Sequence, residues 1–194
     1  YEFTKHPLAH CKTVEEIYEY EWPSLDWYDY SKVKEIVKSN KKTDDRAIMF
    51  FAGGTFETPW YMRGMEQFFI DLYDNPEIVN AICTKVGEYF FKRALRVLEA
   101  ADNEIDIIGS GGDIGGQECL MLNPDVWREQ IKPHTAGLLK PFKRFLGAII
   151  ASSIWLTQLP QPVDSQRRLL RVKLNDKLLV EVGRNIAPIG HSYY

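Results

Sequence analysis

The sequence is poor in cysteine and histidine, with three and four of these among its 194 residues. Cys11, Cys83 and Cys119 are far apart and odd in number. This pattern predicts three free thiols in a reducing cytoplasm rather than a disulfide framework. A structural zinc cluster needs ligands at closer spacing than these cysteines provide.

An excess of positive charge and a long apolar run are also missing. The net charge is −3 and the sequence pI is about 5.9, which disfavours a nucleic-acid surface. No run approaches the length of a membrane span, and no signal-peptide pattern opens the chain. We therefore expect a cytoplasmic protein without a membrane or nucleic-acid partner. The first residue is Tyr1 rather than Met, which predicts a fragment of a longer protein.

The two common nucleotide-binding signatures are absent. Residues 109–114 read Gly-Ser-Gly-Gly-Asp-Ile, so the third glycine of the dinucleotide motif is not in its place. The following helix is expected only from Pro124, and a Gly-Lys-Ser/Thr phosphate loop does not occur. Nucleotide binding by either route is not expected.

Two continuous apolar runs end in glycines. Residues 46–52 precede Gly53, and residues 105–108 precede a glycine-rich loop around Asp113. Continuous rather than alternating apolarity is typical of parallel strands that are buried on both faces. In folds with such strands, the loops at their carboxyl ends line the active site.

Helical periodicity fills the segments around these runs. Helices are expected over residues 14–20, 30–41, 59–72, 76–100 and 124–139. Thr13, Thr58 and Asn123 are the expected capping residues, and Pro133 should kink or divide the last helix. The alternation of strands and helices predicts an α/β fold with parallel strands.

After about Phe145 the character of the sequence changes. Residues 146–153 fit one more strand, and the rest of the segment 146–194 has poor periodicity. It fits an irregular tail, a different domain or a stretch read in the wrong frame. We expect a first domain over residues 1–145 and a divergent tail over residues 146–194.

Three motifs occur in a specific order. They are Phe-Ala-Gly-Gly at 51–54 ahead of Phe56, Trp60 and Tyr61; Asp-Leu-Tyr-Asp-Asn-Pro-Glu at 71–77; and Asp-Ile-Gly-Gly-Gln at 113–117 followed by residues 120–133. Together they resemble the uroporphyrinogen decarboxylase superfamily over about residues 13–143. The resemblance implies part of a (β/α)8 TIM barrel with its site at the carboxyl ends of the strands.

The resemblance leaves three functions open. The first is a lyase of porphyrin biosynthesis that decarboxylates porphyrinogen acetate groups without a cofactor. The second is a methyltransferase that uses zinc and a corrinoid partner, although no zinc ligands are visible in this chain. The third is an incomplete and catalytically inactive barrel. The histidine-containing motif of the family should follow Lys143 by about a dozen residues, but residues 149–154 read Ile-Ile-Ala-Ser-Ser-Ile.

Two residues carry over from the family as candidate catalytic residues, with roles in binding and orientation. A substrate-binding tyrosine falls on Tyr61, and a carboxylate-binding serine falls on Asp113. An acid at this position would repel a carboxylate unless it were protonated or faced a cation. The alternatives are structural roles: Tyr61 would be an aromatic residue of the core, and Asp113 would be a turn residue that bonds its own backbone.

Further residues of the two loops are candidates for substrate binding. Arg63 either meets an anionic ligand or pairs with Glu57 or Glu66. His134 is expected to be structural, and the chain as given is expected to form oligomers because an open parallel sheet exposes its edges. The candidate substrate-binding residues are Glu57, Arg63, Gln117, Gly53 and Gly112.

Overall fold

The computed structural model describes residues 5–43, 47–115, 119–139, 141–142, 149–154, 169–174 and 177–183. The chain divides into two units, residues 1–158 and 159–194. The first unit mixes helices with a parallel sheet, which is compatible with the predicted α/β class. The second holds β4 (Leu169–Leu174) and β5 (Lys177–Gly183), which pair antiparallel.

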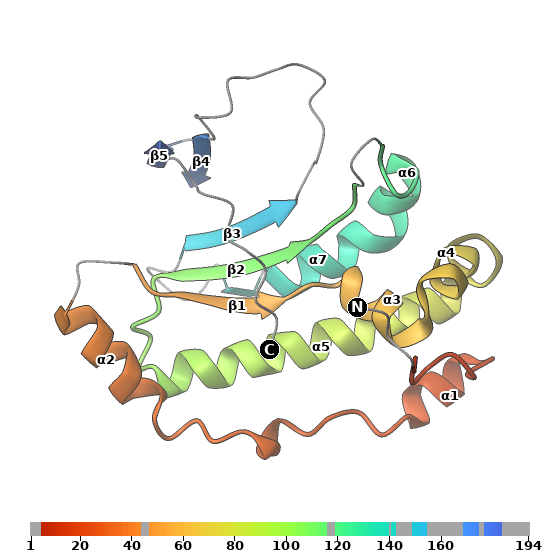
Figure 1. The fold of residues 1–194 in the computed structure, drawn as a ribbon, viewed down its shortest axis with the longest axis horizontal. Helices are drawn as coiled ribbons and strands as arrows, with labels where there is room; N and C mark the ends of the chain where they lie inside the picture. Colours follow the sequence, from red (N-terminus) through yellow and green to blue (C-terminus); the bar gives the residue numbers. More distant parts are fainter. Residues whose placement is uncertain are drawn as a thin grey trace. The chain divides into compact units, whose positions relative to one another are not determined.

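Three parallel strands form the sheet of the first unit. They are β1 (Met49–Gly53), β2 (Ile107–Gly112) and β3 (Ile149–Ile154), in the order β1-β2-β3. All three point the same way, so their carboxyl ends meet at one edge (Figure 1). The second strand is longer than predicted, because residues 109–112 continue it instead of forming a loop.

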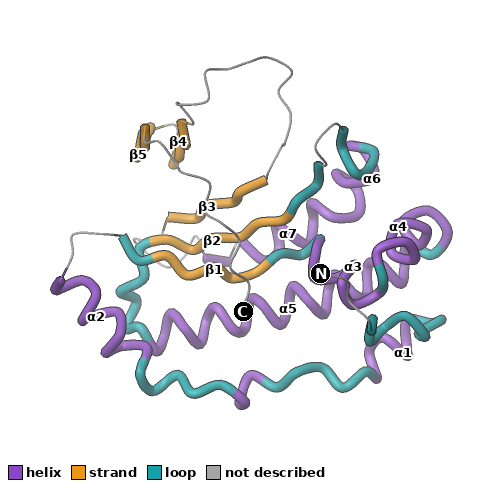
Figure 2. Tube along the Cα trace, viewed as in Figure 1, coloured by secondary structure: helices purple, strands orange, loops and turns teal. Residues whose placement is uncertain are grey.

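Helices precede β1 and connect the strands. They are α1 (Val14–Glu19), α2 (Val33–Thr43), α3 (Glu57–Arg63), α4 (Met65–Asp74), α5 (Pro76–Ala100), α6 (Pro124–Val126) and α7 (Lys132–Leu139), with a π-helical turn at Trp127–Ile131. The long helix α5 runs lengthwise along the sheet (Figure 2) and packs against β1 and α7.

The main core lies between α5 and the sheet. Ala52 and Ile108 are fully buried there against Ile82 and Val86 of α5. Side chains alternate along a strand, so the other face of β1 carries Met49 and Phe51. These two side chains are 58% and 50% exposed, which leaves one face of the sheet open to solvent.

Capping residues explain where several helices begin. Thr13 Oγ1 accepts from the Glu16 N–H at 3.3 Å, and the Glu16 carboxylate accepts in return from the Thr13 N–H, which confirms the predicted capping box. Asn123 accepts from the Asp125 N–H at 2.8 Å. The helix that contains Pro133 is divided, as expected.

One predicted helix start is wrong. The helix after β1 begins at Glu57, and its N-cap is Phe56, not Thr58. Pro59 fits inside the first turn because N–H groups there have no intrahelical partner. The expected helix over 59–72 also breaks at Gly64, whose φ of 91° is a conformation that side chains disfavour.

Candidate functional site

Two loops meet at the carboxyl edge of the sheet. Glu57 is the first residue of α3, four residues beyond β1, and Asp113 directly follows β2. The Glu57 side chain lies over the second loop, since a Cβ added to Gly112 would be 4.0 Å from Glu57 Cγ. The fold therefore places the carboxylates of Glu57 and Asp113 beside each other.

The surroundings of Glu57 favour its protonated form. Burial raises the pKa of Glu57 above its ordinary value, and the negative charge of Asp113 raises this pKa further. A hydrogen bond from the Asp113 backbone lowers it by less than these two effects together. Carboxyl groups with raised pKa values at strand ends are candidates for holding or exchanging a proton.

Tyr61 lies one helical turn after Glu57. Residues four apart share a face of a helix, so both belong to the same side of α3. The half-buried Tyr61 ring packs on Trp60 with 4.0 Å between the ring centroids. The strand end that precedes α3 and the strand end that precedes Asp113 lie at the same edge (Figure 1). The roles assigned to Tyr61 and Asp113 stay predictions.

Arg63 is placed differently from what the sequence suggested. It is only 4% exposed, and its Nε donates to Asp71 Oδ2 at 2.7 Å. Its Nη1 donates to the carbonyl oxygen of Leu8 at 2.6 Å. The expected pairing with Glu57 or Glu66 is therefore wrong, because the break after α3 turns α4 back and brings Asp71 to the guanidinium. Two of its donor groups, Nε and Nη1, are used in the core, and its role in substrate binding stays a prediction.

The candidate glycines have packing roles as well. Gly53 has a φ of 126°, and an added Cβ would lie 2.7 Å from the Phe90 ring. A Cβ added to Gly112 would make only ordinary contacts, at 3.7 Å from Phe56 Cβ and 4.0 Å from Glu57 Cγ. Gln117 lies outside the described residues, so its predicted role stays a prediction.

Sequence reasoning gave little weight to an aromatic cluster beneath these loops. Phe56 and Phe68 are buried, with ring centroids 6.0 Å apart, and Trp60 and Ile114 pack against this cluster. Trp60 Nε1 is buried and has no hydrogen-bond partner among the described residues. The signal in the sequence was the run of aromatics from Phe56 to Tyr61, which we interpreted only as part of a motif.

Metal ligands do not gather in the described part of the chain. No group of three or more His, Cys, Asp or Glu side chains is placed there to hold an ion. The expected cofactor states, none for a decarboxylase and zinc for a methyltransferase, both stay predictions. Among the same residues, no helix has the length and apolarity needed to cross a membrane.

In comparisons with protein-family models, curated proteins and solved structures, nothing matched the chain. The resemblance to the uroporphyrinogen decarboxylase superfamily thus depends on the three sequence motifs alone.

Proposed function

We propose that the chain is part of a (β/α)8 barrel related to the uroporphyrinogen decarboxylases and that its strand-end loops bind a tetrapyrrole. The observation that carries the proposal is the pairing of Glu57 with Asp113 at the carboxyl edge of parallel strands. Sites of parallel α/β folds lie at this edge. The crossover helices between the strands are also what a barrel of this kind requires.

The pair combines two carboxyl groups with different surroundings. Glu57 holds a proton more readily than a free glutamate does, and Asp113 is exposed at the end of β2. A negative charge repels the carboxylates of a porphyrinogen but attracts its N–H groups and a protonated pyrrole ring. Fixed carboxylates would therefore stabilise the cation that precedes loss of carbon dioxide. Tyr61 would orient the ring from α3.

A second candidate is favoured by the acid at position 113. Asp113 stands where the decarboxylases carry serine, and this departure suits the zinc-dependent, corrinoid-linked methyltransferases. In that reaction zinc lowers the pKa of a thiol, which then attacks a corrinoid-bound methyl group. The third candidate, an inactive partial barrel, predicts neither ligand binding nor turnover.

Ligand titrations of the full chain distinguish these functions. Uroporphyrin and hydroxocobalamin are titrated separately and followed by absorbance, and zinc content is measured by mass spectrometry. We expect saturable uroporphyrin binding that weakens about tenfold or more in Asp113→Asn, because a charge-assisted contact is lost. Asp125→Asn, which removes another exposed carboxylate, is the matched control and should bind normally.

Other outcomes reject the proposal. Stoichiometric zinc with corrinoid binding selects the methyltransferase. Binding of neither tetrapyrrole selects the inactive barrel. Equal uroporphyrin affinity in Asp113→Asn and Asp125→Asn would show that the acidic pair does not bind the tetrapyrrole.

A further inference from the structure

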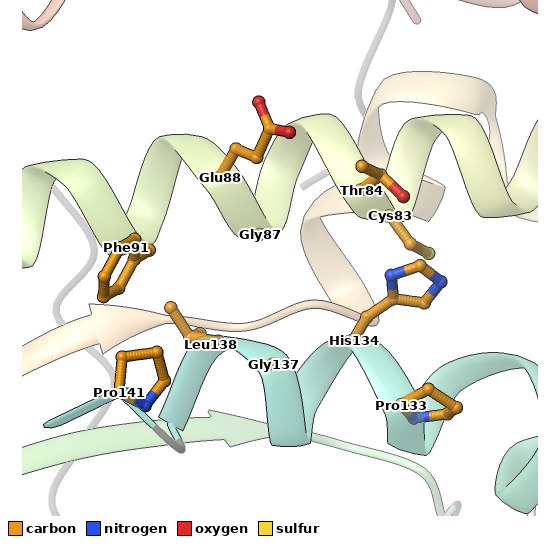
Figure 3. Close-up of a pocket in the computed structure, with 10 residues that line it drawn as sticks. All are labelled: Cys83, Thr84, Gly87, Glu88, Phe91, Pro133, His134, Gly137, Leu138 and Pro141. Carbon is orange, nitrogen blue, oxygen red and sulfur yellow. The ribbon is translucent and has the colours of Figure 1, made fainter. Parts of the chain in front are cut away.

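A cavity of about 290 Å³ lies between α5 and α7. Its α5 wall and α7 wall face each other, and Pro141 closes one end (Figure 3). The lining residues are Cys83, Thr84, Gly87, Glu88, Phe91, Pro133, His134, Gly137, Leu138 and Pro141.

A glycine keeps this space open. A Cβ added to Gly137 would meet no atom within 4 Å, so no neighbour requires glycine at this position. Glycine inside a helix costs roughly 0.5–1 kcal/mol relative to alanine. On the opposite wall, a Cβ added to Gly87 would lie 3.8 Å from the Thr55 side chain, which is an ordinary contact. The side chains of α5 and α7 thus leave the space between the two helices partly empty.

The cavity is apolar along most of its length and polar at one end. Phe91, Leu138 and Pro141 gather at the apolar end, and the His134 ring lies at the other end beside Cys83 (Figure 3). Burial lowers the pKa of His134, so its imidazole is neutral at neutral pH and offers both a donor and an acceptor. Among the described residues, the hydrogen bonds include none to this ring.

The charged and titratable groups around the cavity restrict the ligand further. The Cys83 Sγ donates to the Thr55 carbonyl oxygen at 3.5 Å, and burial raises its pKa, so this thiol stays neutral. Glu88 points away from the cavity in Figure 3 and lies 3.7 Å from Lys92 on the surface. None of the lining residues is a cation, so an anion finds no charge partner there, and Glu88 at the rim opposes its entry.

We propose that the α5–α7 cavity binds a small uncharged molecule with a flat apolar ring and one hydrogen-bonding group, which faces His134. The ring packs between Phe91, Leu138 and the open backbone of Gly137. Small-molecule sites commonly combine apolar walls with a single convergent polar group of this kind.

Phenol and toluene are a matched pair of probes, because they share a ring and differ in the hydroxyl group. The full chain, labelled with ¹⁵N, is titrated with each and followed by NMR at the Gly137 amide and the His134 ring. Saturable shifts of both signals are expected, with phenol binding about fivefold more tightly, the usual effect of one net hydrogen bond.

Three variants test the position and the polar contact. Gly137→Leu fills the cavity and should abolish saturable binding of both probes. Ala136→Leu places the same side chain at the exposed neighbouring position and should leave binding unchanged. His134→Leu should remove the preference for phenol while toluene still binds.

The opposite results would reject the proposed binding site. Shifts that never saturate, unchanged affinity in Gly137→Leu or a phenol preference that survives His134→Leu would each overturn the proposal. If Gly137→Leu does not fold, the phenol-to-toluene ratio in His134→Leu decides alone. Glu57→Gln and Asp113→Asn should bind phenol normally, so failure here is distinguishable from failure of the tetrapyrrole proposal.

Discussion

Glu57 and Asp71 are acidic residues that follow β1, and their surroundings differ in the charge that faces them. Asp71 is fully buried and faces Arg63, and it also accepts hydrogen bonds from Gln67 and Asn75. Glu57 is half-buried and faces the like charge of Asp113. A carboxylate with a cation and several donors stabilises the fold, whereas one beside another carboxylate weakens it unless it takes up a proton.

Glu57→Gln should therefore stabilise the protein at neutral pH. The folded-state pKa of Glu57 is raised, so the stability that its protonated form provides is present below the ordinary pKa of 4.5 and is lost as the pH rises through the folded pKa. Glutamine removes the charge, and the free energy of unfolding at pH 7 should rise by about 0.5 kcal/mol, a small gain because solvent screens this half-exposed carboxylate. Urea unfolding at pH 7 and pH 4.5 measures this gain, which should shrink at the lower pH. Glu66→Gln, at an exposed position, should show no such gain.

Arg63→Ala should destabilise the protein by about 3–5 kcal/mol, because it leaves Asp71 buried without its cation. The control is Lys92→Ala, which removes the exposed pair with Glu88 and should cost at most about 0.5 kcal/mol. Denaturant unfolding compares the two variants. Similar small losses in both would mean that the Arg63–Asp71 pair is not buried as described.

At the scale of the elements, the glycines decide how closely helices and strands approach. Gly53 has a positive φ and lies directly under the Phe90 ring of α5. Gly137 has open space around it. The first glycine is needed for packing, and the second is not.

A pair of alanine substitutions tests this difference. Gly137→Ala should raise the free energy of unfolding by about 0.4–1 kcal/mol, because alanine restricts the unfolded chain and meets no atom in the folded one. Gly53→Ala should lower it by about 1–3 kcal/mol through overpacking against Phe90. Calorimetric melting of both variants measures whether each substitution raises or lowers the free energy of unfolding. A stabilising Gly53→Ala would contradict the described contact with the Phe90 ring.

At the scale of the first unit, α5 packs on one face of the sheet, and Met49 and Phe51 lie exposed on the other face. Among the described strands, β1 and β3 form the two edges of the sheet. Parallel sheets are normally covered on both faces, and free edges pair with other chains.

The chain as given should therefore associate with itself. Light scattering after size-exclusion chromatography should show oligomers, and Met49→Ser combined with Phe51→Ser should shift them toward monomer. Ile70→Ser combined with Tyr73→Ser is the control, because it removes exposed apolar side chains from α4 instead. A monodisperse monomer of the unchanged chain would reject this prediction.

Several local features could be predicted from the sequence alone. The two apolar runs before Gly53 and Gly109 predicted the parallel strands β1 and β2. The apolar stripe along residues 76–100 predicted the helix α5, which ends at Ala100. The capping box at Thr13 was predicted correctly because all of its hydrogen bonds lie within one helical turn. The start of α3 was missed, since the Thr-Pro pair at 58–59 looks like a cap but lies inside the first turn.

Contacts between side chains that are distant in the sequence could be identified only from the tertiary structure. Nothing near Arg63 in the sequence indicates that Asp71, rather than Glu57 or Glu66, would meet its guanidinium, because the choice depends on the break at Gly64. The pairing of Glu57 with Asp113 likewise depends on the register of β1 against β2. The sequence by itself determined periodicity and caps, which are decided within a few residues. Only the tertiary structure decided which distant side chains contact each other, because such contacts depend on the geometry of every element between them.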